Sequence, residues 1–267
     1  MTYRLASTAV MARRAEPAGS LDFFPTPPWA TRALCTHILP QAWPWPDLFN
    51  CAAWDPACGE GHMAVALAEY FVGVRASDIF GYGFSSHVSD FLLPDPVYSP
   101  ESDWIISNPP FNRAAEFVHA ACGQARRGVA MLVRTQFAEG QARYRELFKD
   151  MPPQIDAVFT ERVPMHRGRW VVARSKDGGG SSATSYSWMV WLTRPRGAEW
   201  QHSRRIWIPP CKKQLTKPGD WLTFGGCMDV PANHRVMKRI EQLKRDVKAP
   251  ATPGQMRELK QQLEAMI

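Results

Sequence analysis

The stretch from Trp104 to Phe111, Trp-Ile-Ile-Ser-Asn-Pro-Pro-Phe, constrains the fold of this chain more than any other. Its apolar start, with two adjacent isoleucines, predicts a buried strand, and the prolines predict that the strand ends in a rigid turn. Neither Pro109 nor Pro110 has a backbone N–H, so the carbonyl groups of the turn can accept hydrogen bonds from another group. Ordinary strand-to-loop turns also use Asn and Pro, so the pattern alone fits a purely structural turn as well.

The same turn has the acceptors that an exocyclic amine requires. The side-chain oxygen of Asn108 and the carbonyl of Pro109 could each accept one hydrogen of such an amine. Phe111 would offer a flat apolar face to the ring that carries the amine. The sequence therefore predicts a candidate amine-binding site at the end of this strand.

A strand followed by a glycine-bearing turn precedes this site in the chain. Ala52 to Asp55 predicts the strand, Pro56 to Gly61 the turn, and helical spacing resumes at Met63. In this arrangement the backbone can approach a bound cofactor closely. The third glycine of the dinucleotide fingerprint is missing, and no Lys-Ser/Thr pair follows as in a phosphate-binding P-loop. A small cofactor without a pyrophosphate fits better.

Two acidic residues further along fit a nucleoside-bearing cofactor. A strand is expected over Val72–Ser77, and Asp78 directly after it stands where a doubly wound sheet holds a ribose diol. Ile79 is apolar enough to lie against an adenine face, and Asp90 could accept a hydrogen bond from the adenine amino group. Each carboxylate taken alone also suits a helix cap or an exposed surface position.

Strands and helices alternate through this part of the chain. After Phe111 we expect a helix capped by Asn112, and further elements are expected at 129–133 (strand), 141–148 (helix), 155–159 (strand) and 186–192 (strand). Such alternation predicts an α/β fold with a Rossmann-like, doubly wound, mostly parallel sheet. The strand at 186–192 should pair back on the one at 155–159 as a terminal β-hairpin.

Charge is distributed unevenly along the chain. Residues 1–150 contain 12 Lys and Arg against 15 Asp and Glu, whereas the remaining residues contain 20 against 10, within totals of 32 and 25. A basic second half favours a catalytic body with a polyanion-binding surface, although a solvated basic face without a partner has the same composition.

A basic loop at residues 161–185 surrounds one tryptophan with positive charge. Its basic and aromatic residues are Arg162, Arg167, Arg169, Trp170, Arg174 and Lys176. Basic side chains interleaved with an aromatic ring suit a nucleic-acid strand and an unstacked base. A disordered surface loop would show the same composition.

The two ends of the chain are expected to lie outside the main domain. Residues 1–20 are typical of a flexible arm, and residues 196–267 of a small basic extension with C-terminal amphipathic helices. The apolar stripes of these helices would pack on their own domain or form a homodimer contact. No apolar run reaches the ~20 residues of a membrane span. The six cysteines lack zinc-site spacing, which favours reduced thiols, no metal and a cytoplasmic protein.

Two motifs together resemble those of a known family. Asp55-Pro56-Ala57-Cys58-Gly59-Glu60-Gly61 and Asn108-Pro109-Pro110-Phe111 are similar to motifs of class I S-adenosylmethionine-dependent amino methyltransferases. More narrowly, they resemble adenine-N6 DNA methyltransferases, and Phe24-Pro25-Thr26-Pro27-Pro28 is similar to the N-terminal cofactor motif of that group. The resemblance covers about residues 22 to 192 and implies a methyltransferase domain at 21–195. Related RNA and protein-glutamine methyltransferases have a similar Asn-Pro-Pro-aromatic turn.

The resemblance implies a role for each matching residue. Thr26 would hold the methionine carboxylate of S-adenosylmethionine, and the turn from Asp55 to Gly61 would wrap the methionine and ribose. Asp78 would bind the ribose hydroxyls, with Ile79 and Asp90 on the adenine. The complete expected cofactor set is Phe24, Thr26, Asp55, Pro56, Ala57, Gly59, Gly61, Asp78, Ile79, Asp90 and Phe91, and the expected catalytic set is Asn108, Pro109, Pro110 and Phe111.

The resemblance also implies a substrate and a setting. The substrate would be adenine in DNA, flipped out of the helix, in the cytoplasm of a bacterium or a phage-infected cell. The enzyme would be of a phage, prophage or orphan type, or would belong to a restriction-modification system. RNA and a protein glutamine remain alternative substrates. A further alternative is a module that binds nucleic acid without modifying it.

Overall fold

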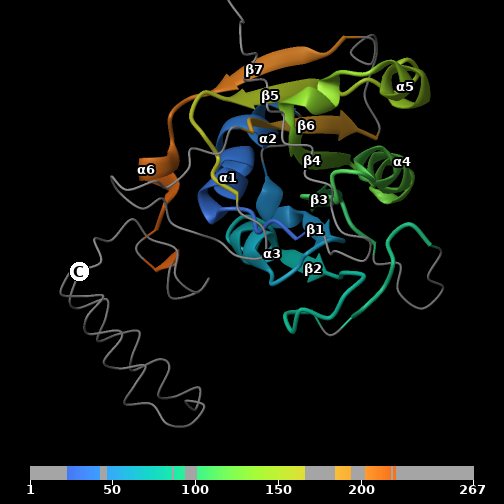
Figure 1. Cartoon of the computed structure of the whole chain (residues 1–267). Coiled ribbons are helices and arrows are strands. Elements are labelled where there is room, and N and C mark those ends of the chain that lie inside the picture. The colour runs from blue at the N-terminus through green and yellow to red at the C-terminus, as the bar shows by residue number, and fades with distance from the viewer. Residues whose placement is uncertain are drawn as a thin grey trace, which may run out of the picture.

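The computed structural model describes residues 23–42, 47–85, 87–93, 101–165, 184–193, 202–217 and 219–220, in which strands and helices alternate (Figure 1). The strands are β1 (Ala52–Asp55), β2 (Gly73–Ala76), β3 (Trp104–Ser107), β4 (Gly128–Arg134), β5 (Ile155–Phe159), β6 (Tyr186–Leu192) and β7 (Arg204–Ile208). The α-helices are α1 (Pro28–Ala33), α2 (Leu39–Ala42), α3 (His62–Leu67), α4 (Ala114–Gln124), α5 (Gln141–Arg143) and α6 (Lys212–Leu215). Shorter helical turns are η1 (Leu34–Ile38), η2 (Leu48–Asn50), η3 (Thr135–Ala138) and η4 (Tyr144–Phe148).

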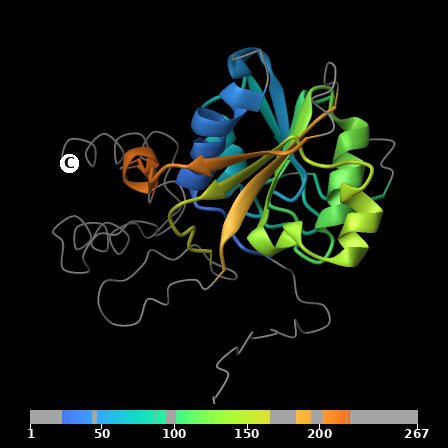
Figure 2. The same cartoon turned by 90° about the horizontal axis from the view of Figure 1, so that it is seen from above.

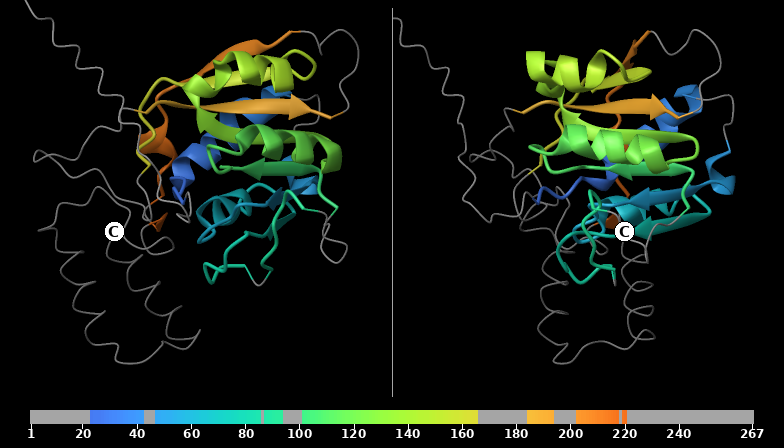
Figure 3. Two further views of the ribbon diagram at one scale, coloured as in Figure 1. Left: turned by 45° about the vertical axis from the view of Figure 1, so that its right-hand side comes forward. Right: turned by 90° about the vertical axis from the view of Figure 1, so that its right-hand side faces the viewer.

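The strands form one seven-stranded sheet in the order β2-β1-β3-β4-β6-β5-β7. Neighbouring strands are parallel except β6, which runs antiparallel to both β4 and β5. Figure 3 shows the sheet extending from β7 (orange) at one edge to β2 (cyan) at the other. The predicted α/β fold with a mostly parallel sheet is confirmed, and so is the antiparallel pairing of β5 with β6.

Helices cover both faces of the sheet (Figure 2). On one face, α1 and α3 pack on a core that includes Trp104 and Ile106, and on the other face α4 packs on a core that includes Ile105. Successive residues of a strand point to opposite faces, so β3 is buried on both sides, and its first three residues are apolar. This double burial fixes the position of the turn that follows β3.

The sheet continues beyond residue 195, into the segment that the sequence analysis assigns to a basic extension. β7 is its edge strand and pairs in parallel with β5, from Ile155 opposite Arg204 to Phe159 opposite Ile208. Ile208 is buried, while Arg204 and Arg205 are exposed. Charged residues at an exposed sheet edge discourage pairing with other chains.

The prediction that Asn112 caps the helix after Phe111 is wrong. Arg113 precedes α4, and no side chain caps the start of this helix. The backbone N–H of Arg113 donates to the carbonyl of Pro110 at 3.0 Å. The proline turn therefore extends through Asn112, and the helix begins later than the sequence indicates.

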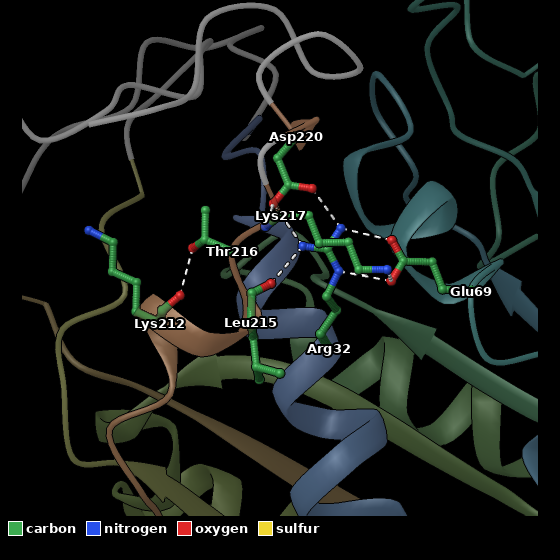
Figure 4. A network of polar contacts seen from close by, with 7 residues as sticks. All are labelled: Arg32, Glu69, Lys212, Leu215, Thr216, Lys217 and Asp220. Carbon is green, nitrogen blue, oxygen red and sulfur yellow. Dashed lines mark hydrogen bonds and ion pairs between the residues drawn. The ribbon is translucent and has the colours of Figure 1, made fainter. Parts of the chain in front are cut away.

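A buried arginine joins three segments that are far apart in the sequence (Figure 4). The guanidinium of Arg32 in α1 donates to Asp220 at 2.6 and 2.7 Å, to Glu69 at 2.8 and 2.9 Å, and to the carbonyl of Leu215 at 2.7 Å. Burial alone would lower the pKa of Arg32, but its hydrogen bonds with Asp220 and Glu69 outweigh this effect and raise it. The network links α1 to the end of α3 and to the segment after α6.

Substituting Asp220 tests the contribution of this network to stability. Asp220→Ala leaves the Arg32 guanidinium, 2% exposed, with Glu69 as its remaining carboxylate. Removing one partner of a buried ion pair costs about 3–5 kcal/mol, so we expect a clear loss in the free energy of unfolding, measured by urea denaturation. Glu116→Ala breaks an exposed pair with Arg113 and should change the stability little. Equal effects of the two substitutions would contradict this role for Arg32.

Candidate functional site

The carboxyl ends of β1, β2 and β3 lie along one cleft. The strand order reverses at β1, which has β2 on one side and β3 on the other, and open α/β sheets bind ligands at such a position. Asp55 ends β1, Asp78 follows β2 and Asn108 follows β3, and all three line the cleft. Phe24, Pro25 and Thr26, which precede α1, line it as well.

Most of the residues expected to bind a cofactor surround this cleft. Those that line it are Phe24, Thr26, Asp55, Pro56, Ala57, Asp78, Ile79, Asp90 and Phe91. Among the four residues of the Asn-Pro-Pro-Phe turn, Asn108 and Pro110 line the same cleft. The structure thus brings together two motifs that are about 50 residues apart in the sequence.

The Asn108 side chain is held with its oxygen unpaired. Its Nδ2 donates to the carbonyl of Phe24 at 2.8 Å and lies 3.8 Å from the sulfur of Met165. Within the described part of the chain, its Oδ1 is buried and has no hydrogen-bond partner. A buried acceptor without a donor costs about 1–3 kcal/mol, and a ligand N–H that reached this oxygen would recover that cost.

Asp55 connects the end of β1 to the Asn108 turn. Its carboxyl group is 1% exposed, and its Oδ1 accepts from Ser107 Oγ at 2.8 Å and from the backbone N–H of Ala57 at 3.3 Å. Burial raises the pKa of Asp55 to about 7, although both hydrogen bonds act in the opposite direction, and the charge of Asp78 adds to the rise. This carboxyl group therefore titrates near neutral pH.

Asp78 connects the end of β2 to the glycine turn. Its carboxylate accepts from the backbone N–H groups of Gly59 at 2.8 Å and of Phe80 at 3.1 Å. Burial raises the pKa of Asp78 against these hydrogen bonds. The backbone of the glycine turn thus holds the Asp78 side chain in the lining of the cleft.

The glycine turn has the backbone conformation that its sequence predicts. Gly59 and Gly61 have φ angles of 51° and 82°, which residues other than glycine rarely adopt. A Cβ at Gly59 would lie 2.3 Å from the Phe23 ring, and one at Gly61 would lie 2.4 Å from the Phe84 ring. Aromatic rings therefore occupy the space beside both glycines, and neither glycine is among the residues that line the cleft.

The rest of the Asn-Pro-Pro-Phe turn lies beside the cleft. Pro109 is buried, and the Phe111 ring packs on Phe24 with their centroids 5.3 Å apart. The guanidinium of Arg134, at the end of β4, lies 4.1 Å from the centroid of the Phe111 ring. Because β4 is the direct neighbour of β3 in the sheet, Arg134 covers part of the Phe111 ring, which was expected from the sequence to face a substrate.

Several residues of the cleft were not predicted from the sequence. Tyr82 lines it and stacks on Phe23 with the centroids 4.7 Å apart, and burial raises the pKa of Tyr82 to about 12. His62 and Arg113 line it too. The available signals were the position of His62 directly after the glycine turn and the run of aromatic residues from Phe80 to Phe84.

Several predicted residues fall where the structure gives no description. Arg162 is exposed and donates to Ser185 Oγ at 2.6 Å, but Arg167, Arg169, Trp170, Arg174 and Lys176 lie outside the described residues. The same holds for the N-terminal arm and the C-terminal helices. Among the described residues, no group of three or more His, Cys, Asp or Glu could hold a metal ion, and no helix could cross a membrane.

Comparisons with known proteins yield matches to solved structures alone. No family model and no curated protein matches the chain. A putative class I S-adenosylmethionine-dependent methyltransferase from Listeria monocytogenes is 12% identical over 76% of this chain and 70% of its own, with a TM-score of 0.49. A type I restriction-modification methyltransferase subunit from Streptococcus thermophilus is 12% identical over 65% of this chain and 45% of its own, with a TM-score of 0.43. A putative RNA methyltransferase from Pyrococcus horikoshii is 12% identical over 61% and 82%, with a TM-score of 0.40. At these scores, such similarities carry no argument about activity.

The raised pKa of Asp55 predicts how stability depends on pH. Between its ordinary value of 3.8 and about 7, the folded protein keeps a proton that the unfolded chain releases, so the stability of the folded state falls as pH rises through this window. Asp55→Asn keeps the shape of the side chain and has no proton to lose.

Urea unfolding of both proteins at pH 5, 6, 7 and 8 measures this effect. The wild type should lose stability relative to Asp55→Asn by up to about 1.4 kcal/mol per pH unit below pH 7, and the difference should level off above it. A difference that stays constant from pH 5 to pH 8 would show that Asp55 does not titrate in this range.

Proposed function

We propose that this protein is an S-adenosylmethionine-dependent methyltransferase that methylates the exocyclic N6 amine of adenine in DNA. The observation that supports this most directly is the unpaired Oδ1 of Asn108, a buried acceptor in the lining of a cleft that also contains Asp55 and Asp78. An exocyclic amine has the hydrogens that this acceptor lacks.

The composition of the cleft fits the proposed cofactor. The carboxylate of Asp78, at the end of the second strand, suits a ribose diol, and the apolar side chains of Ile79, Phe91 and Phe117 suit an adenine ring. Thr26, which is 3% exposed, has a hydroxyl group near the start of α1 for the methionine carboxylate. When bound, S-adenosylmethionine would supply an electrophilic methyl group on its sulfonium.

The residues of the turn would make the amine reactive. The lone pair of the adenine N6 is delocalised into the ring, so this amine is a poor nucleophile. Hydrogen bonds from the amine to Asn108 Oδ1 and to the Pro109 carbonyl would favour a pyramidal nitrogen and stabilise the positive charge that develops on it. This is the cationic counterpart of an oxyanion hole, in which fixed dipoles act on charge that appears in the transition state.

The neighbouring residues would keep these acceptors fixed. The hydrogen bond from Asn108 Nδ2 to the Phe24 carbonyl leaves the amide oxygen as the available acceptor, and the two prolines restrict the backbone of the turn. Ser107, bonded to Asp55, anchors the residue directly before Asn108. A preorganised site avoids the reorganisation that water would need during methyl transfer.

Asn108→Ala tests the proposal. The substitution removes the amine acceptor, and we expect the transfer of a labelled methyl group to DNA to fall by at least about 100-fold. Because the substitution also removes the hydrogen bond to the Phe24 carbonyl, calorimetry of S-adenosylmethionine binding is run in parallel, and the transfer rate is compared at saturating cofactor. Asn112→Ala, at an exposed position of the same loop, is the matched control and should retain activity. Near wild-type transfer by Asn108→Ala would refute the proposed role.

The same assay separates the alternative substrates. DNA, RNA and a ribosomal extract are each incubated with the wild-type protein and labelled cofactor. Label in RNA or in protein but not in DNA would reassign the substrate while keeping the chemistry of the turn. Binding of nucleic acid without any binding of S-adenosylmethionine would instead support a non-catalytic binding module.

A further inference from the structure

An exposed arginine lies on the aromatic residue of the Asn-Pro-Pro-Phe turn. Arg134 ends β4, and its guanidinium lies 4.1 Å from the centroid of the Phe111 ring. Tyr186 is its partner in the register of β4 and β6, and the rings of Tyr186 and Phe111 lie 6.1 Å apart. Arg134 is therefore held beside the proposed amine site by an aromatic contact on the turn itself.

The positive charge of Arg134 is not neutralised by the part of the protein that the structure describes. Four of the other exposed or half-buried arginines form ion pairs: Arg113 with Glu116, Arg126 with Glu101, Arg127 with Asp103 and Arg205 with Asp156. Within the described ranges, the side chain of Arg134 forms no ion pair with a carboxylate, and its guanidinium lies over the Phe111 ring. Its guanidinium thus keeps its hydrogen-bond donors available for an anion.

A second arginine contacts the neighbouring strand end. The backbone N–H of Thr135, next to Arg134, donates to the carbonyl of Ser185 at 3.0 Å, and Arg162 donates to the hydroxyl of the same serine at 2.6 Å. Both Arg134 and Arg162 are exposed. Two guanidinium groups therefore flank the start of β6, next to the Phe111 side of the turn.

We propose that Arg134 binds the backbone phosphate next to the target nucleotide, with its guanidinium stacked on Phe111, and so selects a nucleic acid over a protein as the substrate. This inference rests on the proposed function, because the target base must reach Asn108. A guanidinium matches a phosphate with two parallel hydrogen bonds, and the ring beneath it fixes its orientation. A glutamine side chain is neutral and carries no phosphate, so a protein substrate would leave this charge unused.

Salt-dependent binding of a fluorescent single-stranded DNA oligonucleotide tests this role directly. Each phosphate neutralised on a single strand adds about −0.7 to the slope of log K against log salt concentration. Arg134→Gln should therefore weaken binding at low salt and make the slope shallower by about 0.7. Arg134→Lys keeps the charge and should keep the slope, although it loses the planar match to the phosphate.

Arg75→Gln is the matched control. Arg75 is also exposed, but it lies on the edge strand β2, which is separated from the β4 strand of Arg134 by β1 and β3. Its substitution should leave both the affinity and the salt slope unchanged. Thermal unfolding of each variant checks that the fold is intact. A wild-type slope in Arg134→Gln, or no binding of the oligonucleotide by the wild type, would overturn the proposed phosphate contact.

Methyl transfer is measured separately, so that the two proposals can fail independently. A wild-type protein that binds DNA through Arg134 but transfers no methyl group would refute the proposed function and keep the phosphate contact. If Arg134→Gln methylates DNA as efficiently as the wild type, with equal KM values at all salt concentrations, the proposed phosphate contact is refuted and the proposed methyltransferase function stands. Methylation of protein alone would refute the selection of a nucleic acid.

Discussion

The hydrogen bond from Asn108 Nδ2 to the Phe24 carbonyl is the interaction on which the proposed site depends. An amide side chain can present either its NH2 group or its oxygen to a ligand, and here the NH2 group faces the Phe24 carbonyl and the sulfur of Met165 inside the protein. The acceptor is left buried and unpaired. The same bond joins the segment before α1 to the turn after β3, so one contact both orients the amide and connects two segments that line the cleft.

The sheet supplies the remaining constraints. Because β1 lies between β2 and β3, Asp55 at the end of β1 and Asp78 after β2 lie near the turn that follows β3. Ser107 links this turn to Asp55, and the backbone of Gly59 links Asp78 to the glycine turn. Burial raises the pKa of Asp55 and the charge of Asp78 adds to the rise, so a positively charged ligand in the cleft would favour the ionised form of Asp55. The proposed sulfonium cofactor would bring such a charge.

Much of this arrangement can be predicted from local sequence. The alternation of strands and helices predicts the sheet, and the positions of Asp55, Asp78 and Asn108 at strand ends predict that they meet, because parallel strands have their carboxyl ends on one edge. Packing between distant segments could not be predicted in this way. Three contacts depend on which strands and loops become neighbours. They are the ring contact of Tyr82 with Phe23, the cation–π contact of Arg134 with Phe111 and the ion pair of Asp220 with Arg32. The start of α4 also differs from the prediction, because the proline turn uses Asn112.

Nucleoside analysis by mass spectrometry tests the central claim most directly. DNA is purified from cells that lack adenine methylation of their own and express either the wild-type protein or the variant without the Asn108 amide. We expect N6-methyladenine in DNA from cells with the wild-type protein and none in DNA from cells with the variant. The absence of N6-methyladenine in both, or equal amounts in both, would contradict it.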